Sequence, residues 1–276
     1  MRLGIVSDPH VSPLNAEPYV WHNTVELSRS IELLEAGLEW LREQDIDRLV
    51  LLGDLTEAAD PASFAVVRER VLAFSVPVLA VPGNCDVDPG DRTVTTFEQI
   101  AEPVLTIAPA LVSKGDVGPI ELIGLAGELG SKRLSGIRAP DAPPTGWRIV
   151  LTHYPVLDFE PDLAEAGFKH SGNLANRAEL EAGLRESSAP SVVIHGHLHM
   201  HEARISGSLL HLSCAALIEP PHHVNVIEVA VGNAEIVVER RAHSVRPFAV
   251  ERLPVFAPDQ GRWIWTGDSW HTPQAH

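Results

Sequence analysis

The chain has 276 residues, a formal net charge of −16 and two cysteines, Cys85 and Cys214. An acidic protein of this kind does not attract polyanions through its overall field, so extended nucleic-acid binding is not expected. Two cysteines indicate no disulfide framework, and no apolar stretch approaches the roughly 20 residues of a membrane-spanning helix. The first apolar run is too short for a signal peptide. These features predict a soluble, cytoplasmic protein with one large domain or two small ones.

The first third of the chain contains three apolar runs that predict buried strands, at residues 3–6, 48–52 and 77–81. Helices are predicted between them, at 24–44 with Asn23 as its cap and at 61–74 with Pro61 at its start. Strands that alternate with helices indicate a βαβαβ unit and a parallel sheet. Their nearly continuous apolar sequences are typical of a sheet that is covered on both faces.

The middle of the chain has weaker patterns. Short helices are predicted at 93–101 and 176–186, and residues 131–144 have the composition of a mobile loop. Further apolar runs predict strands, at residues 120–125, 147–151, 191–194, 203–205, 209–212, 224–231 and 234–239. The last four runs have no helix between them, and Gly232-Asn233 favours a hairpin turn. We therefore expect them to add antiparallel strands to a second sheet.

The chain loses its periodicity from residue 241 onward. We divide it into a domain over residues 1–240 and a tryptophan- and proline-rich tail over 241–276. Three tryptophans rarely stay fully exposed, so the tail either folds as a clasp over the sheet or contributes to a subunit interface. The second possibility would make the protein a homo-oligomer through its tail.

Side chains that can bind metals follow five of the predicted strands. They are Asp8 with His10, Asp54, Asn84, His153, and His197 with His199. The carboxyl ends of strands in open α/β sheets are where such folds place their sites. Two aspartates, four histidines and one asparagine suit two adjacent divalent ions with oxygen and nitrogen ligands. Two such ions can clamp an in-line displacement at phosphorus.

The order and spacing of these motifs resemble the calcineurin-like metallophosphoesterases. The motifs are Asp8-x-His10, Gly53-Asp54, Gly83-Asn84-x-Asp86, a lone His153 and Gly196-His197-x-His199. The resemblance implies an α/β fold, a four-layer α/β/β/α sandwich of two mixed sheets flanked by helices. Within the superfamily, the start at Asp8-x-His10 and the chain length are most similar to bacterial cyclic-nucleotide and glycerophosphodiester phosphodiesterases.

The resemblance also implies a catalytic arrangement with two metal ions, which Asp54 would bridge. The ligands completing one site would be Asp8, His10 and His199, and those completing the other would be Asn84, His153 and His197. This set of ligands is compatible with manganese, iron or zinc. A metal-bridging hydroxide would then attack the phosphorus of a small phosphoester.

One position departs from the pattern of the superfamily. Cys85 stands where its members usually have a histidine that is thought to bind the phosphate and assist the leaving group. Cys85 is therefore predicted to contact the substrate with Asn84, or else to be a small filler, and the general acid is unassigned. A loop of the superfamily near His222 and His223 approaches the phosphate, so we predict that one of them contacts substrate; the alternative is an exposed pair.

Two more residues are predicted to support the ligands, namely Asp86 and His195. The predicted function is that of a dinuclear-metal phosphodiesterase, and the alternatives within the fold are a phosphomonoesterase and a nucleotide pyrophosphatase. A non-catalytic scaffold of the same fold normally has eroded ligands, whereas all seven positions are filled here. A metallo-β-lactamase-type hydrolase is excluded because the sequence has no His-x-His-x-Asp-His cluster.

Overall fold

The computed structural model describes residues 1–13, 16–87, 105–107, 111–113, 119–123, 146–168, 172–186, 189–233, 235–247 and 260–273. Within these residues the strands form two large sheets and one small hairpin. The first sheet contains, in spatial order, β16 (Trp270–His271), β15 (Gln260–Trp265), β14 (Ile236–Ser244), β13 (His223–Val231), β1 (Arg2–Val6), β4 (Arg48–Leu51), β5 (Val78–Ala80) and β6 (Leu105–Ile107).

The second sheet contains both parallel and antiparallel strand pairs. Its spatial order is β11 (Glu202–Ser206), β12 (Leu209–Ser213), β10 (Ser191–His195), β9 (Arg148–Thr152), β8 (Pro119–Ile123) and β7 (Leu111–Ser113). The small hairpin pairs β2 (Tyr19–Val20) with β3 (Thr24–Val25). The helices are η1 (Leu27–Arg29), α1 (Ser30–Arg42), α2 (Pro61–Val71), α4 (Glu160–Glu165) and α5 (Arg177–Glu186).

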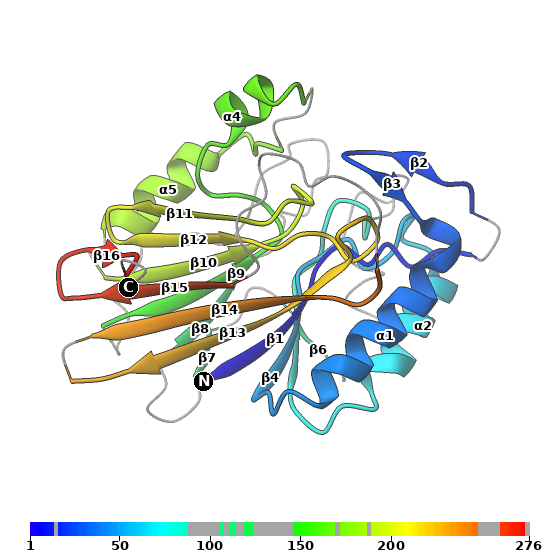
Figure 1. The fold of residues 1–276 in the computed structure, drawn as a ribbon, viewed down its shortest axis with the longest axis horizontal. Helices are drawn as coiled ribbons and strands as arrows, with labels where there is room; N and C mark the ends of the chain where they lie inside the picture. Colours follow the sequence, from blue (N-terminus) through cyan, green and yellow to red (C-terminus); the bar gives the residue numbers. More distant parts are fainter. Residues whose placement is uncertain are drawn as a thin grey trace.

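Three apolar clusters define the layers of the fold. Leu34 and Leu38 of α1, with Phe64 of α2, pack against Leu51 on one face of the first sheet. The inner faces of the two sheets meet in a second cluster, whose members include Leu3, Val50, Leu151 and Ile194. A third cluster joins Leu180 and Leu184 of α5 to Val150 and Val193 on the outer face of the second sheet. The layers are therefore α/β/β/α, which confirms the predicted architecture (Figure 1).

The beginning of the chain confirms the predicted parallel unit. Strand β1 pairs in parallel with β4, and β4 pairs in parallel with β5. Helix α2 begins at Pro61, and the Asp60 side chain accepts a hydrogen bond from the Ser63 N–H at 2.8 Å, so Asp60 caps this helix.

The helix predicted over 24–44 is shorter than expected. Residues 24–25 form β3, and α1 begins only at Ser30. Asn23 does not cap it, because the helix begins seven residues after Asn23 and Arg29 occupies its N-cap position. The Asn23 N–H donates instead to the buried carboxylate of Glu219 at 2.8 Å, and its side-chain amide donates to the Pro220 carbonyl at 3.1 Å. The helix and loop predicted at 93–101 and 131–144 lie outside the described residues.

The strands after residue 200 are divided between the sheets, which corrects the expectation that all would be antiparallel strands of a second sheet. Strand β12 joins the second sheet by pairing in parallel with β10, and β11 pairs antiparallel with β12. Strands β13 and β14 return to the first sheet, where β13 pairs antiparallel with β1. The free edge of β1 opposite β4 provides this pairing position.

The tail contributes two strands to the first sheet. Strand β14 crosses the predicted boundary at residue 240, and β15 pairs antiparallel with it. Trp263, Trp265 and Trp270 are buried in the cluster between the sheets. The indole N–H of Trp270 donates to the Ser208 carbonyl at 2.9 Å. These contacts favour the clasp within one chain, while the division into a domain and a tail stays a prediction.

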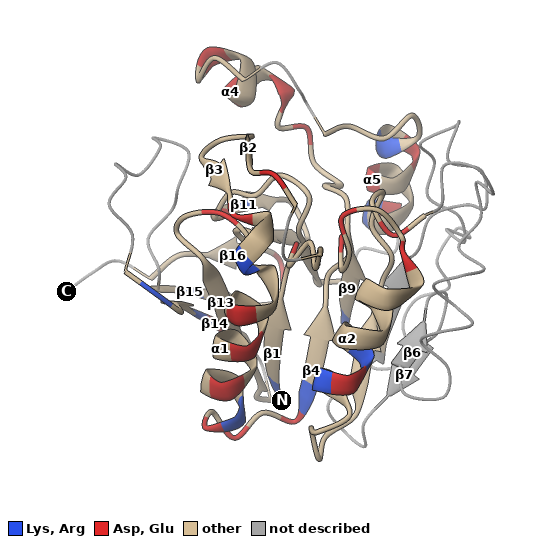
Figure 2. Ribbon diagram, turned by 90° about the vertical axis from the view of Figure 1, so that its right-hand side faces the viewer, with Lys and Arg blue, Asp and Glu red and all other residues tan. Residues whose placement is uncertain are grey.

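The charges of the helices agree with the acidic composition. Acidic residues recur along α1 and α4, and both acidic and basic residues occur on α2 and α5 (Figure 2). None of the helices in the described part of the chain is long and apolar enough to cross a membrane.

Candidate metal centre

The seven predicted ligands all lie in loops that leave the carboxyl ends of central strands. Asp8 and His10 follow β1, Asp54 follows β4, and Asn84 follows β5 in the first sheet. In the second sheet, His153 follows β9, and β10 leads to His197 and His199. The two sheets therefore bring their ligands to one common edge of the sandwich.

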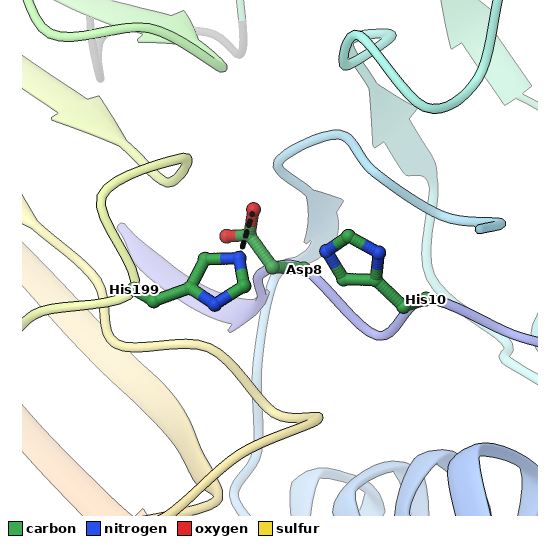
Figure 3. A group of neighbouring side chains, drawn as sticks. All are labelled: Asp8, His10 and His199. Carbon is green, nitrogen blue, oxygen red and sulfur yellow. Dashed lines mark ion pairs between the residues drawn. The ribbon is translucent and has the colours of Figure 1, made fainter. Parts of the chain in front are cut away.

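Two groups of donor atoms gather at this edge. Asp8, His10 and His199 form one group, in which the Nε2 of His199 lies 3.4 Å from a carboxylate oxygen of Asp8. Figure 3 shows the His199 ring directed at Asp8, with His10 approaching from the opposite side. The His10 and His199 ring centroids are 5.3 Å apart.

The second group consists of Asp54, His153 and His197. The Nε2 of His153 lies 3.5 Å from Asp54 Oδ2 and 3.2 Å from His197 Nδ1. Asp54 also faces the first group, because its Oδ2 is 3.7 Å from His10 Nε2. One carboxylate therefore lies between the two sets of donors, where a bridging ligand is required.

Five of the ligands adopt the left-handed backbone conformation, which non-glycine residues rarely do. They are Asp8, His10, Asp54, His197 and His199, with φ angles from 43° to 64°. Each such residue costs on the order of 1–3 kcal/mol and persists only where surrounding contacts impose it. The concentration of this strain in five ligands indicates that the loops are shaped for the site rather than for folding stability.

Glycines allow the loops to approach one another. A Cβ atom at Gly196 would collide with the Ser7 hydroxyl and the Asp8 carboxylate, and one at Gly83 would collide with Asp54. Steric crowding therefore explains why glycine precedes the ligand in the motifs Gly196-His197 and Gly83-Asn84. The glycine makes room for a ligand that belongs to another strand.

Each of three ligand histidines has a partner on the ring nitrogen that faces away from the cluster. His10 Nδ1 lies 2.7 Å from Glu57, His199 Nδ1 lies 2.8 Å from Glu219, and His153 Nδ1 lies 2.7 Å from the Leu52 carbonyl. Such partners fix the ring orientation and leave Nε2 free for a metal. Neither glutamate was predicted from the sequence. The one available sign was Glu219, a lone carboxylate within an apolar stretch.

The two residues predicted to support the ligands are both buried. Asp86 accepts hydrogen bonds from the backbone N–H groups of Leu55, Thr56 and Gly83, at 2.9–3.0 Å, and so ties the Asp54 loop to the Asn84 loop. His195 has its Nδ1 2.8 Å from the Gly196 carbonyl. Burial lowers the pKa of His195 to about 3, so its ring is neutral.

Asn84 lies beside the second group, and Cys85 lies near Asp54 and His10. The Tyr154 hydroxyl donates to the side-chain oxygen of Asn84 at 3.3 Å, and its ring packs against the His197 ring with centroids 4.5 Å apart. The Cys85 backbone N–H donates to Asp54 Oδ1 at 2.7 Å. The Cys85 thiol accepts from the Asn84 amide at 3.2 Å and lies with His10 and Glu57 in a third donor group.

His222 and His223 are not an exposed pair, because both are buried. His222 Nδ1 lies 2.9 Å from the Leu217 carbonyl, and its Nε2 lies 3.5 Å from Glu26. The His223 ring packs edge-on against His201, with centroids 5.3 Å apart. None of these contacts joins them to the two donor groups, so a substrate contact by either residue stays a prediction.

The histidines of the site hold the carboxylates of Asp8 and Asp54 ionised. Burial by itself lowers the pKa of a histidine, but Asp8 and then Glu219 outweigh it and raise the pKa of His199 to about 10. In the same way Asp54 raises the pKa of His153 to about 9. Burial would raise the pKa of Asp8 and Asp54, yet the histidines lower both. Ionised carboxylates in a buried site favour the binding of cations there.

The donor set fits two metal ions. The Nε2 of His10 is buried and has no hydrogen-bond partner among the described residues, although it faces Asp54. Burial lowers the pKa of His197 to about 3, so its ring is the neutral form that binds metals. A buried polar side-chain atom without a partner is rare in folded proteins, and a metal ion bound here would be a partner for His10 Nε2.

Comparisons with known proteins agree with this geometry. Residues 1–234 match the family described as the calcineurin-like phosphoesterase superfamily domain. A dimetal phosphatase of Danio rerio is similar in structure, with a TM-score of 0.61 and 15% identity, over 86% of this chain and 94% of that one. Purple acid phosphatase PPD1 of yellow lupin (Lupinus luteus) has a TM-score of 0.55 and 15% identity, over 95% of this chain and 53% of its own.

A third similar structure is GAP50, described as the anchor in the inner membrane complex of Plasmodium. Its TM-score is 0.51 and its identity 11%, over 93% of this chain and 91% of its own. No curated protein sequence gives a significant match. At these identities the structural comparisons show a shared fold and nothing finer.

Proposed function

Because this chain belongs to the calcineurin-like phosphoesterase superfamily and is therefore a hydrolase, we propose that it is a dinuclear-metal phosphodiesterase that acts on a small substrate. The observation that carries this proposal is the position of Asp54 between two donor groups. Its carboxylate is 3.7 Å from His10 on one side and 3.5 Å from His153 on the other. A scaffold protein has no need for a buried carboxylate shared in this way.

The ligand sets that we propose follow the two groups. One ion would be held by Asp8, His10 and His199 and the other by Asn84, His153 and His197, with Asp54 as the ligand that both would share. When bound, two divalent ions supply Lewis acidity at the phosphoryl group and a nucleophile derived from water. Manganese, iron and zinc are all compatible with these oxygen and nitrogen donors.

The protein's own residues orient and shield this site. Glu57 and Glu219 hold the rings of His10 and His199, and Asp86 holds two ligand loops together. Cys85 is neutral, because burial and then the charge of Asp54 raise the pKa of its thiol. A neutral thiol is a weak hydrogen-bond donor, so we assign it no proton transfer to the leaving group.

We propose a diester substrate because the first motif, Asp8-x-His10, resembles that of phosphodiesterases. The alternatives are a phosphomonoesterase and a nucleotide pyrophosphatase. The test is a panel of p-nitrophenyl substrates given to protein loaded with each metal. Bis-p-nitrophenyl phosphate, p-nitrophenyl phosphate and thymidine 5′-(p-nitrophenyl phosphate) share one leaving group, so their rates compare only the rest of the molecule. We expect the two diesters to have the higher kcat/KM.

The Asp54→Ala variant serves as the control for contaminating hydrolases. A preference for the monoester would overturn the assignment as a diesterase, and equal rates for wild type and Asp54→Ala would overturn the proposed site. The cytoplasmic location and the homo-oligomer through the tail stay predictions.

A further inference from the structure

The β2–β3 hairpin presents aromatic side chains beside the first donor group. Tyr19 and Trp21 keep 38% and 36% of their surfaces exposed. The Trp21 ring centroid lies 6.2 Å from that of His199, at a tilt of 55°. Since His199 Nε2 lies 3.4 Å from Asp8 in the first donor group, the partly exposed Trp21 is next to one ligand of the proposed first metal site.

The hairpin is fixed to the site by its own contacts. His22 Nε2 lies 2.7 Å from the Leu198 carbonyl, and the His22 ring packs edge-on against Phe168 with centroids 4.1 Å apart. The Asn23 N–H donates to Glu219, the same carboxylate that holds His199. A contact made by Trp21 is therefore held at a constant place relative to the proposed first metal site.

Val20 precedes Trp21 in the hairpin and is 74% exposed. Its side chain lies on the face of β2 opposite to that of Tyr19, because successive side chains of a strand alternate. Val20 is therefore a suitable control position beside Trp21.

We propose that Trp21 is a specificity-determining residue that stacks on a planar ring of the substrate. This inference rests on the proposed phosphoesterase function and adds a substrate class: small phosphoesters that carry a planar aromatic or heteroaromatic group, such as a nucleobase. Stacking on an aromatic side chain accepts any ring with a π-face. The acidic chain does not attract extended polyanions, so the ring belongs to a small molecule.

The test is isothermal titration of the metal-loaded protein with three non-hydrolysed ligands: phenylphosphonate, cyclohexylphosphonate and inorganic phosphate. The variants are Trp21→Ala, Trp21→Phe, which keeps a ring, and Val20→Ala, which changes the exposed neighbour. We expect Trp21→Ala to weaken phenylphosphonate binding about 10-fold. In the same variant the affinity for inorganic phosphate should change by no more than about twofold, and the affinity for cyclohexylphosphonate should fall clearly less than that for phenylphosphonate. Trp21→Phe should keep most of the affinity for phenylphosphonate.

Two results would overturn the inference. One is unchanged phenylphosphonate binding in Trp21→Ala, and the other is an equal loss for phenyl and cyclohexyl ligands, which would mean a general apolar contact. Both differ from failure of the proposed function. If the protein hydrolyses no phosphoester but binds phenylphosphonate through Trp21, the proposed function is wrong and the ring-binding site stands. If the protein is an active diesterase whose ligand binding does not depend on Trp21, the proposed function stands and the inference about Trp21 is wrong.

Discussion

Glu219 Oε1 lies 2.8 Å from the Nδ1 of His199, and its other oxygen accepts the backbone N–H of Asn23 at 2.8 Å. The glutamate is fully buried. One carboxylate therefore fixes both a proposed metal ligand and the hairpin that carries Trp21. It is a positioning residue, because it acts on the metal site through His199.

The Glu219→Gln variant tests this role. A glutamine has one acceptor oxygen and no charge, so it cannot hold both the His199 ring and the Asn23 N–H. We expect metal affinity at one of the two sites to fall about 10- to 100-fold, as is usual when such a partner is lost. The measurement is calorimetric titration with Mn²⁺. The matched control is Glu228→Gln, a half-exposed glutamate that pairs with Arg2. Equal metal affinity in Glu219→Gln and wild type would contradict the role.

Gly196 is expected to tolerate no side chain. An added methyl group would collide with Ser7 and Asp8, both buried, and would push Asp8 away from His199. We predict that Gly196→Ala destabilises the protein by roughly 1–3 kcal/mol and loses metal. Gly232→Ala is the control, since its methyl group would meet Glu235 only at 3.6 Å. Urea unfolding and metal analysis measure the effects; normal metal content in Gly196→Ala would refute the steric account.

Cys85 is predicted to contribute through its backbone rather than its thiol. Its N–H donates to Asp54 Oδ1 at 2.7 Å, and this contact does not involve the side chain. Cys85→Ser should therefore keep its metals and change activity little. Activity in the wild type should fall steeply as the leaving group becomes more basic, and Cys85→His should flatten this dependence, because imidazolium can donate a proton.

The measurement for Cys85 is a rate series over aryl and alkyl diesters with all three proteins. A roughly thousandfold loss of activity in Cys85→Ser, about 4 kcal/mol of barrier, would mean that the thiol acts directly.

The tail is predicted to stabilise the fold. Removal of residues 245–276 takes away β15 and β16 and exposes the apolar surface that Trp263 and Trp270 cover. We expect lower solubility and a lower melting temperature, and Trp263→Ala alone should cost about 3–5 kcal/mol. Gln260→Ala, at an exposed position of the same strand, is the control. An unchanged melting temperature and oligomeric state after truncation would contradict this prediction.

The ligand loops could be predicted because each consists of a few consecutive residues at the end of an apolar strand. His197 and His199 follow β10 directly, and Asp8 and His10 follow β1, so pattern and spacing were sufficient. Glu219 escaped because its importance depends on a contact with His199, 20 residues away in the sequence, that only the fold creates.

The sheet assignment of the later strands could not be predicted for a similar reason. Strands β12 and β13 are both apolar and buried, so their sequences do not distinguish one sheet from the other. The choice depends on which strand edge is open, next to β10 or next to β1. The capping role predicted for Asn23 was wrong because residues 24–25 form β3 and α1 begins only at Ser30.

Anomalous diffraction from crystals soaked in Mn²⁺ locates each bound ion and so shows whether Asp54 is shared by two metal sites. We expect two peaks about 3.5–4 Å apart, one beside Asp8, His10 and His199 and the other beside His153 and His197. The Asp54 carboxylate should contact both, and both peaks should weaken in Asp54→Ala. A single peak, or two peaks of which only one contacts Asp54, would contradict the account.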